Sequence, residues 1–295
     1  MKISNALTID VEDFFHVAAL SRSIPVTEWD NMTCRVEKNT GLLLDLFERH
    51  QARATFFVLG WVAERYPGLI KTIHAAGHEI ASHGYSHQLI YSQTKDIFTA
   101  ETLKSKQLLE DITGDAILGY RAASYSITNK SLWALDILVE AGFKYDSSIF
   151  PVHHDNYGIP GSPTVPHILK TPAGHSLVEY PLTTYRLFGQ SLPVAGGGYF
   201  RLYPYWLSKY FYTKINQSGN PFVFYLHPWE VDPGQPRVKA SWFSEFRHYN
   251  NLDKCEQRLT NLLADFTFIT MDEKLTELDL YAPDSDITTK YKNVV

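Results

Sequence analysis

Short apolar segments alternate with longer amphipathic segments, and this alternation limits the fold of the chain more than any other feature. The first 150 residues contain five apolar runs with the length and composition of buried strands, separated by helix-like segments. The apolar runs lie at residues 6–10, 54–59, 78–82, 117–120 and 143–146, and the helical patterns at residues 36–50, 67–76, 96–112 and 131–140. Such alternation predicts an α/β fold with a parallel sheet, either closed or doubly wound.

The pattern changes between about residues 150 and 220, where prolines recur and three consecutive glycines follow at 196–198. This stretch predicts a loop-rich insertion with short strands such as residues 176–180. Alternation then resumes, with helical patterns at residues 205–216 and 253–264 and strand-like runs at residues 222–226 and 266–270. An α/β barrel of this length often forms one unit, so we expect a single catalytic domain over residues 1–280 and a polar tail at 281–295.

Composition excludes several classes of protein and of partner. The 295-residue chain is 44% hydrophobic and carries a net charge of −5 without a basic block, which argues against disorder and against nucleic-acid binding. Two distant cysteines, Cys34 and Cys255, exclude a disulfide scaffold. Neither a signal peptide nor an 18-residue apolar stretch is found. The cytoplasm is therefore the expected location, and work in the periplasm or at a membrane is left open.

Polar residues follow several of the apolar runs, where a parallel sheet gathers its active site. His83 and His87 come directly after the third run, with Gly84 between them. Two histidines and one carboxylate are a common hydrolytic zinc set that leaves a coordination position for water. The acidic cluster at residues 10–13 is the expected source of the carboxylate. Asp10 and Glu12 share one side if the strand continues, so one can bind metal and the other accept a proton.

Other strand-end residues have both a catalytic and a structural interpretation. His227 follows the run FVFYL and suits a general acid, although a buried histidine with a backbone partner fits equally well. Arg121 could clamp a carboxylate or form a surface ion pair. Asp146 could orient a histidine or cap a turn. Among the many late aromatic residues, Tyr199 and Trp229 are the candidates for stacking on sugar rings.

Five motifs carry a family resemblance: TIDVED, GHEIASHGYSH, RAASYS, DSS and YLHPWE. In this order, over about residues 5–275, they resemble the motifs of the NodB-homology polysaccharide deacetylases, carbohydrate esterase family four. The segments GGGYFRLYPYWLS and FYLHPWEVDPGQPR resemble a narrower subgroup encoded with exopolysaccharide systems associated with exosortase and PEP-CTERM sorting. The resemblance implies a distorted (β/α) barrel, usually with seven strands. It also implies a glycan substrate and the exopolysaccharide synthesis machinery as a partner.

The resemblance also implies a metal site with an adjacent base. His83 and His87 match the family's two metal-binding histidines, and Asp10 matches its catalytic base. The metal-binding acid follows that base directly or two residues later, and an apolar residue occupies the adjacent position here. Glu12 is therefore the expected third ligand, with Asp13 in reserve, and Zn²⁺ is the expected ion.

Further site residues follow from the same resemblance. Arg121 matches the arginine that pairs with the base, although Ala123 stands where the family often has proline. Asp146 matches the acid that orients the catalytic histidine, and His227 matches that histidine, the general acid. A backbone N–H near Tyr125 is expected to stabilise the oxyanion.

The expected function is metal-dependent hydrolysis of N-acetyl groups from N-acetylhexosamine units, in exopolysaccharide biosynthesis. One alternative is a non-catalytic glycan-binding or assembly protein with a relic site. Another is an amidohydrolase that acts on a small cyclic amide. A non-haem iron oxygenase shares the two-histidine, one-carboxylate set but usually has a different fold. The complete set of acids, histidines and arginine favours the deacetylase, because a relic site tends to lose members.

Overall fold

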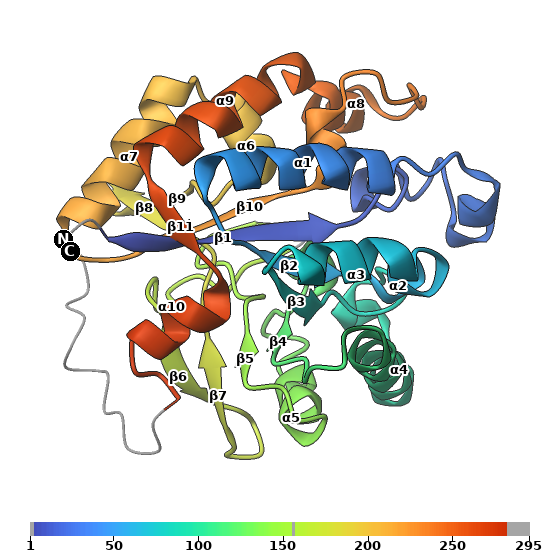
Figure 1. Ribbon diagram of the computed structural model, residues 1–295. Helices are drawn as coiled ribbons and strands as arrows, with labels where there is room; N and C mark the ends of the chain where they lie inside the picture. Colours follow the sequence, from blue (N-terminus) through green and yellow to red (C-terminus); the bar gives the residue numbers. More distant parts are fainter. Residues whose placement is uncertain (1–2, 155–156, 282–295) are drawn as a thin grey trace.

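The computed structural model describes residues 3–154 and 157–281, and a single large sheet organises it (Figure 1). Its strands are β1 (Ser4–Val11), β2 (Thr55–Val58), β3 (Glu79–Ser82), β4 (Gly119–Tyr120), β5 (Tyr145–Asp146), β6 (His167–Lys170), β7 (Ser176–Glu179), β10 (Val223–Leu226) and β11 (Thr267–Ile269). The strand order is β10-β1-β2-β3-β4-β5-β7-β6, and β11 pairs with β1. All neighbours from β10 to β7 are parallel, whereas β6 and β7 are antiparallel. The predicted distorted barrel with about seven parallel strands is confirmed.

Helices surround the sheet on its outer side (Figure 1). They are α1 (Val36–His50), α2 (Gly60–Arg65), α3 (Pro67–Ala75), α4 (Lys95–Thr113), α5 (Trp133–Glu140), α6 (Gly197–Leu202), α7 (Tyr205–Gln217), α8 (Trp242–Tyr249), α9 (Leu252–Asp265) and α10 (Met271–Glu277). A short 3₁₀ helix, η5 (Pro228–Val231), follows β10. No helix in the described ranges is long and apolar enough to cross a membrane.

Strand β1, which pairs with β2, β10 and β11, is buried on both faces, and its two faces have different roles. Leu7, Ile9 and Val11 alternate along one face and pack into the main hydrophobic core with the surrounding helices. Thr8 and Asp10 alternate with them, point to the inside of the barrel and are also buried. The interior of the barrel is therefore polar around β1, which is where a buried site can form.

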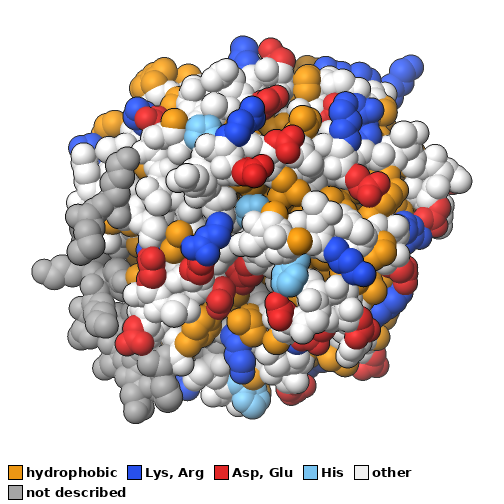
Figure 2. Space-filling view, viewed as in Figure 1, with side chains coloured by type: hydrophobic (Ala, Val, Ile, Leu, Met, Phe, Trp, Pro, Cys, Tyr) orange, Lys and Arg blue, Asp and Glu red, His pale blue; other side chains and the backbone are white. Residues whose placement is uncertain are grey.

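Local sequence signals explain where several helices begin and end. Helix α4 begins after Thr94, whose hydroxyl accepts a hydrogen bond from the backbone of Ile97. It ends at Gly114, which has the positive φ of 79° that glycine tolerates. On the face shown in Figure 2, charged side chains are interspersed with apolar ones, as is usual for solvent-facing helices.

Most predicted elements appear within two or three residues of their expected positions. The loop-rich stretch at about 150–220 contains β6, β7, α6, α7 and a separate hairpin of β8 (Thr184–Leu187) and β9 (Gln190–Pro193). That hairpin was not expected, because its turn residues Phe188 and Gly189 lack the usual Asn-Gly or Asp-Gly pattern. Of the predicted tail, residues 282–295 lie outside the described ranges.

Candidate active site

Three side chains form a cluster that could hold a metal ion. One ligand atom from each of Glu12, His83 and His87 lies within 4.8 Å of the others. Glu12 follows β1, and the two histidines follow β3, so neighbouring parallel strands deliver all three to one end of the sheet. The carboxylate and both imidazoles are almost completely buried. Burying an ionised carboxylate is costly unless positive charge compensates it.

The hydrogen bonds around this cluster leave its metal-binding lone pairs available. Nδ1 of His83 donates to the carbonyl oxygen of Arg121 at 2.8 Å, so the other ring nitrogen can bind a metal. Oε2 of Glu12 lies 2.9 Å from Nε2 of His87 but accepts no hydrogen bond from the described residues. Burial lowers the pKa of His83 to about 4, which keeps its imidazole neutral. Two imidazoles and one carboxylate fit Zn²⁺ or a similar divalent ion.

The reserve candidate Asp13 lies in a different environment. Its carboxylate accepts hydrogen bonds from the backbone of Phe14, the thiol of Cys34 and the backbone of Arg35. These bonds satisfy Asp13 and hold the loop that precedes α1. Between the two acids, only Glu12 contributes to the cluster with His83 and His87.

Asp10 and Arg121 form a buried ion pair beside the metal cluster. Nη1 of Arg121 lies 2.7 Å from Oδ1 of Asp10 and 2.8 Å from the hydroxyl of Thr8. Its remaining nitrogens donate to the carbonyl and hydroxyl oxygens of Ser147. The guanidinium carbon also lies 4.1 Å from the ring centre of Phe57. Arg121 is therefore fully buried, each of its three guanidinium nitrogens has an oxygen partner, and it fixes one oxygen of Asp10.

His227 approaches both carboxylates from β10. Its Nε2 lies 3.4 Å from Oε1 of Glu12 and 4.0 Å from Oδ2 of Asp10. Its Nδ1 lies 2.7 Å from Oε1 of Glu230. Burial disfavours the charged ring, but Glu12, Glu230 and Asp10 together outweigh it and raise the pKa of His227 to about 9. The ring thus has the surroundings that favour a protonated imidazole at neutral pH.

The acid that orients His227 is Glu230, which corrects the expectation for Asp146. Asp146 ends β5, four strands beyond β1 in the sheet, and its carboxylate accepts a hydrogen bond from the hydroxyl of Ser148 at 2.6 Å. Glu230 lies three residues after His227 on η5, where its side chain also accepts from the backbone of His227. The sequence carries a signal for this contact, because Glu230 follows His227 by three residues across a turn that Pro228 begins. Arg201 lies 2.5 Å from Glu230 and is buried with it.

Trp229 cannot serve as the sugar platform expected from the sequence. It is only 5% exposed, and its ring stacks against both His227 and His248 at centroid distances of 5.1 and 4.4 Å. Its indole N–H donates to Oε1 of Glu12 at 3.3 Å. Trp229 therefore positions Glu12 and His227 instead of facing solvent.

The two tyrosine candidates lie elsewhere around this centre. The backbone N–H of Tyr125 already donates to the carbonyl of Ala122 at 3.0 Å, so that amide is not free to stabilise an oxyanion. The Tyr125 ring packs edge-on against Tyr225, which in turn packs against His227. Tyr199 is half-buried, and its hydroxyl lies 3.2 Å from that of Tyr157. Its proposed contact with substrate stays a prediction.

Comparisons with known proteins divide the chain into two matched regions. Residues 22–145 match the family model described as polysaccharide deacetylase, and residues 147–276 match one described as a domain of unknown function, DUF3473. The chain therefore combines a region similar to polysaccharide deacetylases with a region similar to DUF3473. The first region supplies His83, His87 and Arg121, whereas the second supplies His227 and Glu230. Strands from both regions pair in one sheet.

Individual relatives agree with the first of these matches. A peptidoglycan deacetylase of Helicobacter pylori is 37% identical over 113 residues, which cover 38% of this chain and 37% of that protein. The matched segments span 37% and 52% of the lengths of the first two curated relatives. The named relatives are deacetylases, which are hydrolases of amide carbon–nitrogen bonds.

Solved structures resemble this chain over almost its whole length. A protein described as a probable polysaccharide deacetylase from Pseudomonas aeruginosa superposes with a TM-score of 0.59 at 17% identity, covering 94% of this chain and 91% of that one. PuuE allantoinase superposes with a TM-score of 0.60 at 16% identity, covering 94% and 90%. At these identities the likeness shows the fold alone.

Proposed function

We propose that this chain is a metal-dependent deacetylase that hydrolyses N-acetyl groups from N-acetylhexosamine units of a glycan. The observation that carries the proposal is the buried Glu12–His83–His87 cluster with His227 and Asp10 at its edge. The matched deacetylase region and the deacetylase relatives support the same reaction class.

The cluster residues would hold a divalent cation, for which Zn²⁺ is our first choice. When bound, such an ion supplies Lewis-acid polarisation of the acetamide carbonyl and lowers the pKa of a bound water. The buried Oε2 of Glu12, which lies beside Nε2 of His87, and the His83 ring oriented by the carbonyl of Arg121 support this assignment. The carbonyl that accepts from His83 belongs to the same residue that pairs with Asp10, so the two parts of the site are mechanically linked.

Asp10 is the proposed general base. Arg121 holds its Oδ1, which leaves Oδ2 to accept a proton from the attacking water. Arg121 is completely buried and donates four hydrogen bonds to oxygen atoms, one of them to Asp10. We infer that it keeps this carboxylate in one orientation during turnover.

His227 is the proposed general acid that protonates the leaving amine. Glu230 accepts the Nδ1 proton and so directs Nε2 toward the two carboxylates that border the site. Arg201 in turn fixes Glu230. The general acid His227 and the residues that orient it therefore all belong to the DUF3473 region. We propose that residues 1–280 act as one catalytic domain.

We further propose that the natural role is in exopolysaccharide biosynthesis, with the synthesis machinery as a partner. The support is the resemblance of the segments GGGYFRLYPYWLS and FYLHPWEVDPGQPR to the subgroup encoded with such systems. Deleting the gene should raise the acetyl content of the exopolysaccharide, and an unchanged acetyl content would remove this role.

Two variants test the assignment of metal ligand and acid. His83→Ala should lose most bound metal and acetate release from N-acetylglucosamine oligomers. His227→Ala should keep the metal and lose turnover. The exposed His74 pairs with Asp115 far from the site, so His74→Ala is a matched control that should behave as the wild type. Full activity of His83→Ala would refute the metal assignment. A wild-type rate of His227→Ala would refute the assignment of His227 as the general acid.

The glycan-binding alternative makes a different prediction. A relic site would bind sugar in a calorimeter equally well in wild type, His83→Ala and Asp10→Ala, with no acetate released by any of them. A cyclic-amide hydrolase would open a ureide ring but leave N-acetylglucosamine oligomers intact.

A further inference from the structure

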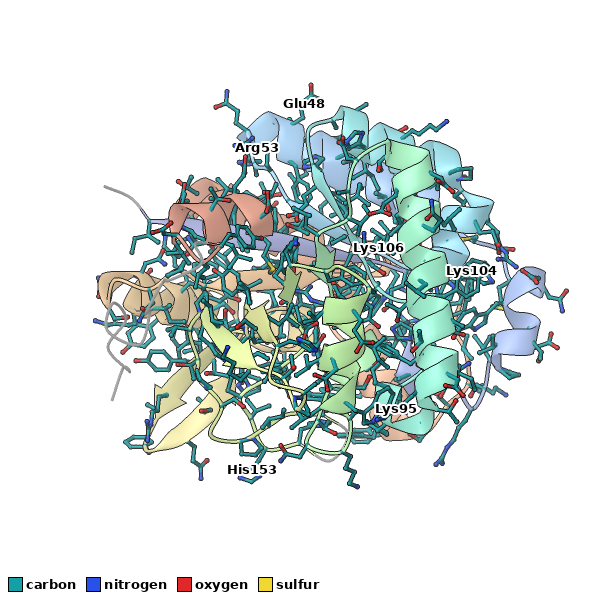
Figure 3. All side chains as sticks on the ribbon, turned by 90° about the horizontal axis from the view of Figure 1, so that it is seen from below. Glu48, Arg53, Lys95, Lys104, Lys106 and His153 are labelled. Carbon is teal, nitrogen blue, oxygen red and sulfur yellow. The ribbon has the colours of Figure 1, made fainter. Side chains whose placement is uncertain are left out.

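The β8–β9 hairpin and helix α7 together expose a group of large apolar side chains. Phe188 is 96% exposed, Trp206 69% and Tyr210 47%, and Leu187 beside Phe188 is 39% exposed. We call these four residues the hairpin–α7 patch. Figure 1 shows β8 and β9 beside α7, and in Figure 3 the hairpin stands out at the edge of the molecule, away from α4 with its labelled Lys95 and Lys104.

Ring contacts join the two parts of the patch. Tyr185 of β8 packs against Phe211 and Tyr210 of α7 at centroid distances of 4.9 and 6.3 Å. Trp206 lies one helical turn before Tyr210, so both belong to the same side of α7. The hairpin tip therefore extends an aromatic surface that α7 begins, and the patch is one surface and not two.

The turn at the hairpin tip is built at a conformational cost. Phe188 and Gly189 both have positive φ, 49° and 79°, as a two-residue hairpin turn of this kind requires. Asn or Gly adopts the first position readily, whereas a bulky side chain with positive φ is a rare outlier. A fully exposed phenylalanine contributes nothing to packing within the chain. A strained and exposed apolar tip does not stabilise the fold, which favours a role in binding.

Charge distinguishes this part of the chain from the rest. Residues 180–229 contain no Asp or Glu, although the whole chain has a net charge of −5. The cations of this stretch include Arg186 and Lys214, both exposed, and Lys209, which pairs with Asp265. Arg186 directly precedes the apolar tip, and Lys214 lies one turn after Tyr210. The patch thus combines apolar and aromatic side chains with a flanking positive charge.

We propose that the hairpin–α7 patch docks the enzyme on the surface of an anionic phospholipid bilayer. Phe188 and Leu187 would enter the boundary between headgroups and acyl chains, where Trp206 and Tyr210 also partition. Arg186 and Lys214 would contact the anionic headgroups. A sugar chain is a poorer match, because a protruding Leu-Phe tip offers no polar edge to pair with hydroxyl groups. Docking of this kind would bring the enzyme to glycan that is made or anchored at a membrane.

Cosedimentation with vesicles tests the proposal with the full-length enzyme. The probe is phosphatidylglycerol–phosphatidylcholine vesicles at low and at high salt, with pure phosphatidylcholine vesicles for comparison. The wild type should bind the anionic vesicles, at least ~10-fold more weakly at 0.5 M salt. The double variant Phe188→Asn, Trp206→Gln should bind at least ~10-fold more weakly than the wild type. Asn suits the positive φ of the turn, so this variant should keep or raise the melting temperature.

Trp242→Gln is the matched control, because Trp242 is 77% exposed but lies on α8, outside the patch. It should bind vesicles as the wild type does. Failure of the wild type to bind at low salt would overturn the proposal, as would equal binding to both vesicle types. Loss of vesicle binding in Trp242→Gln alone would show that α8 forms the membrane-binding surface, which would also overturn the proposal. A dimer that becomes monomeric in the double variant would identify the patch as a contact between copies, which also overturns it.

The experiments can refute the docking proposal without refuting the proposed deacetylase activity, and the reverse. The double variant lies outside the site, so it should release acetate from soluble oligomers at the wild-type rate whether or not vesicle binding is lost.

Discussion

The sequence alone identifies the individual residues of the candidate site, but not the residues that form hydrogen bonds with them. Glu12, His83 and His87 could be singled out because each follows an apolar run directly, and the structure brings them within 4.8 Å of one another. Thr8 and Ser147 hold Arg121 across large sequence separations, and no local pattern indicates such contacts. The sequence favours Asp146 as the partner of His227, whereas Glu230 makes that hydrogen bond, because a sequence shows which acids end strands but not which of them faces a given histidine.

Glu230→Gln tests whether a charged partner sets the acid function of His227. Gln keeps the hydrogen-bonding shape but removes the charge that stabilises the protonated ring, so kcat should fall about 10- to 100-fold with metal content unchanged. Steady-state kinetics and metal analysis on the same samples measure this. Because Arg201 would lose its buried partner, near-ultraviolet circular dichroism must first show intact packing. An unchanged kcat in a folded, metal-loaded variant would contradict the role of Glu230.

At the scale of elements, the parallel strands were predictable because each is a compact apolar run between helices. The β8–β9 hairpin and α8 were not predicted. The turn of the hairpin uses Phe188, and α8 directs Trp242, Phe243 and Phe246 to solvent, so hydrophobicity there does not mark a buried face. The contact between β10 and the residue that precedes α6 also depends on a feature that sequence does not reveal. Gly196 pairs with Tyr225 of β10 through an isolated parallel bridge.

Gly196→Ala should disrupt this junction between elements. An added Cβ would lie 2.0 Å from the carbonyl oxygen of Tyr225, and the φ of 140° is itself unfavourable for alanine. We expect destabilisation of about 3 kcal/mol or more, measured by denaturant unfolding. Gly41→Ala is the control, since nothing lies near its Cβ position in α1, and it should stabilise the protein by about 0.5–1 kcal/mol. Equal effects of the two changes would show that the bridge is unimportant.

Across the whole molecule, buried carboxyl groups make stability depend on pH. Burial raises the pKa of Asp146 to about 6 and raises that of Glu179, next to it in the sheet, well above its usual value. At pH values above the ordinary pKa of a carboxyl group and below these raised pKa values, the folded state therefore binds more protons than the unfolded state. Stability from this pair is present in acid and is lost as pH rises from about 4 through 6 and beyond.

Glu179→Gln should remove most of this dependence. Gln can still accept the hydrogen bond from the backbone of Ile149, but it leaves Asp146 without a neighbouring acid. The free energy of unfolding of the variant should match the wild type near pH 4 and exceed it near pH 8. Denaturant unfolding of both proteins at several pH values, without added metal, measures the difference. A variant less stable than the wild type at pH 8 would contradict the assignment.

The single sheet also explains how two separately matched regions meet at one site. β1, which precedes the first matched region, pairs with β10 of the second region on one side and with β2 of the first region on the other. This arrangement brings His227 to the metal cluster. Alternation of strands and helices was enough to predict a barrel-like fold. It could not predict that the last strands, β10 and β11, both pair with the first strand β1, because strand order depends on long-range packing and not on local pattern. That the chain acts as one domain, and which residues bind substrate, stay predictions.

The central claim is metal-dependent deacetylation at the Glu12–His83–His87 cluster. Acetate release from N-acetylglucosamine oligomers, measured with chelated enzyme and with the same enzyme reloaded with Zn²⁺, tests it most directly. We predict no release after chelation and restored release when about one equivalent of zinc is bound. Release at the same rate by fully chelated enzyme, or none from enzyme with zinc bound stoichiometrically, would contradict the account.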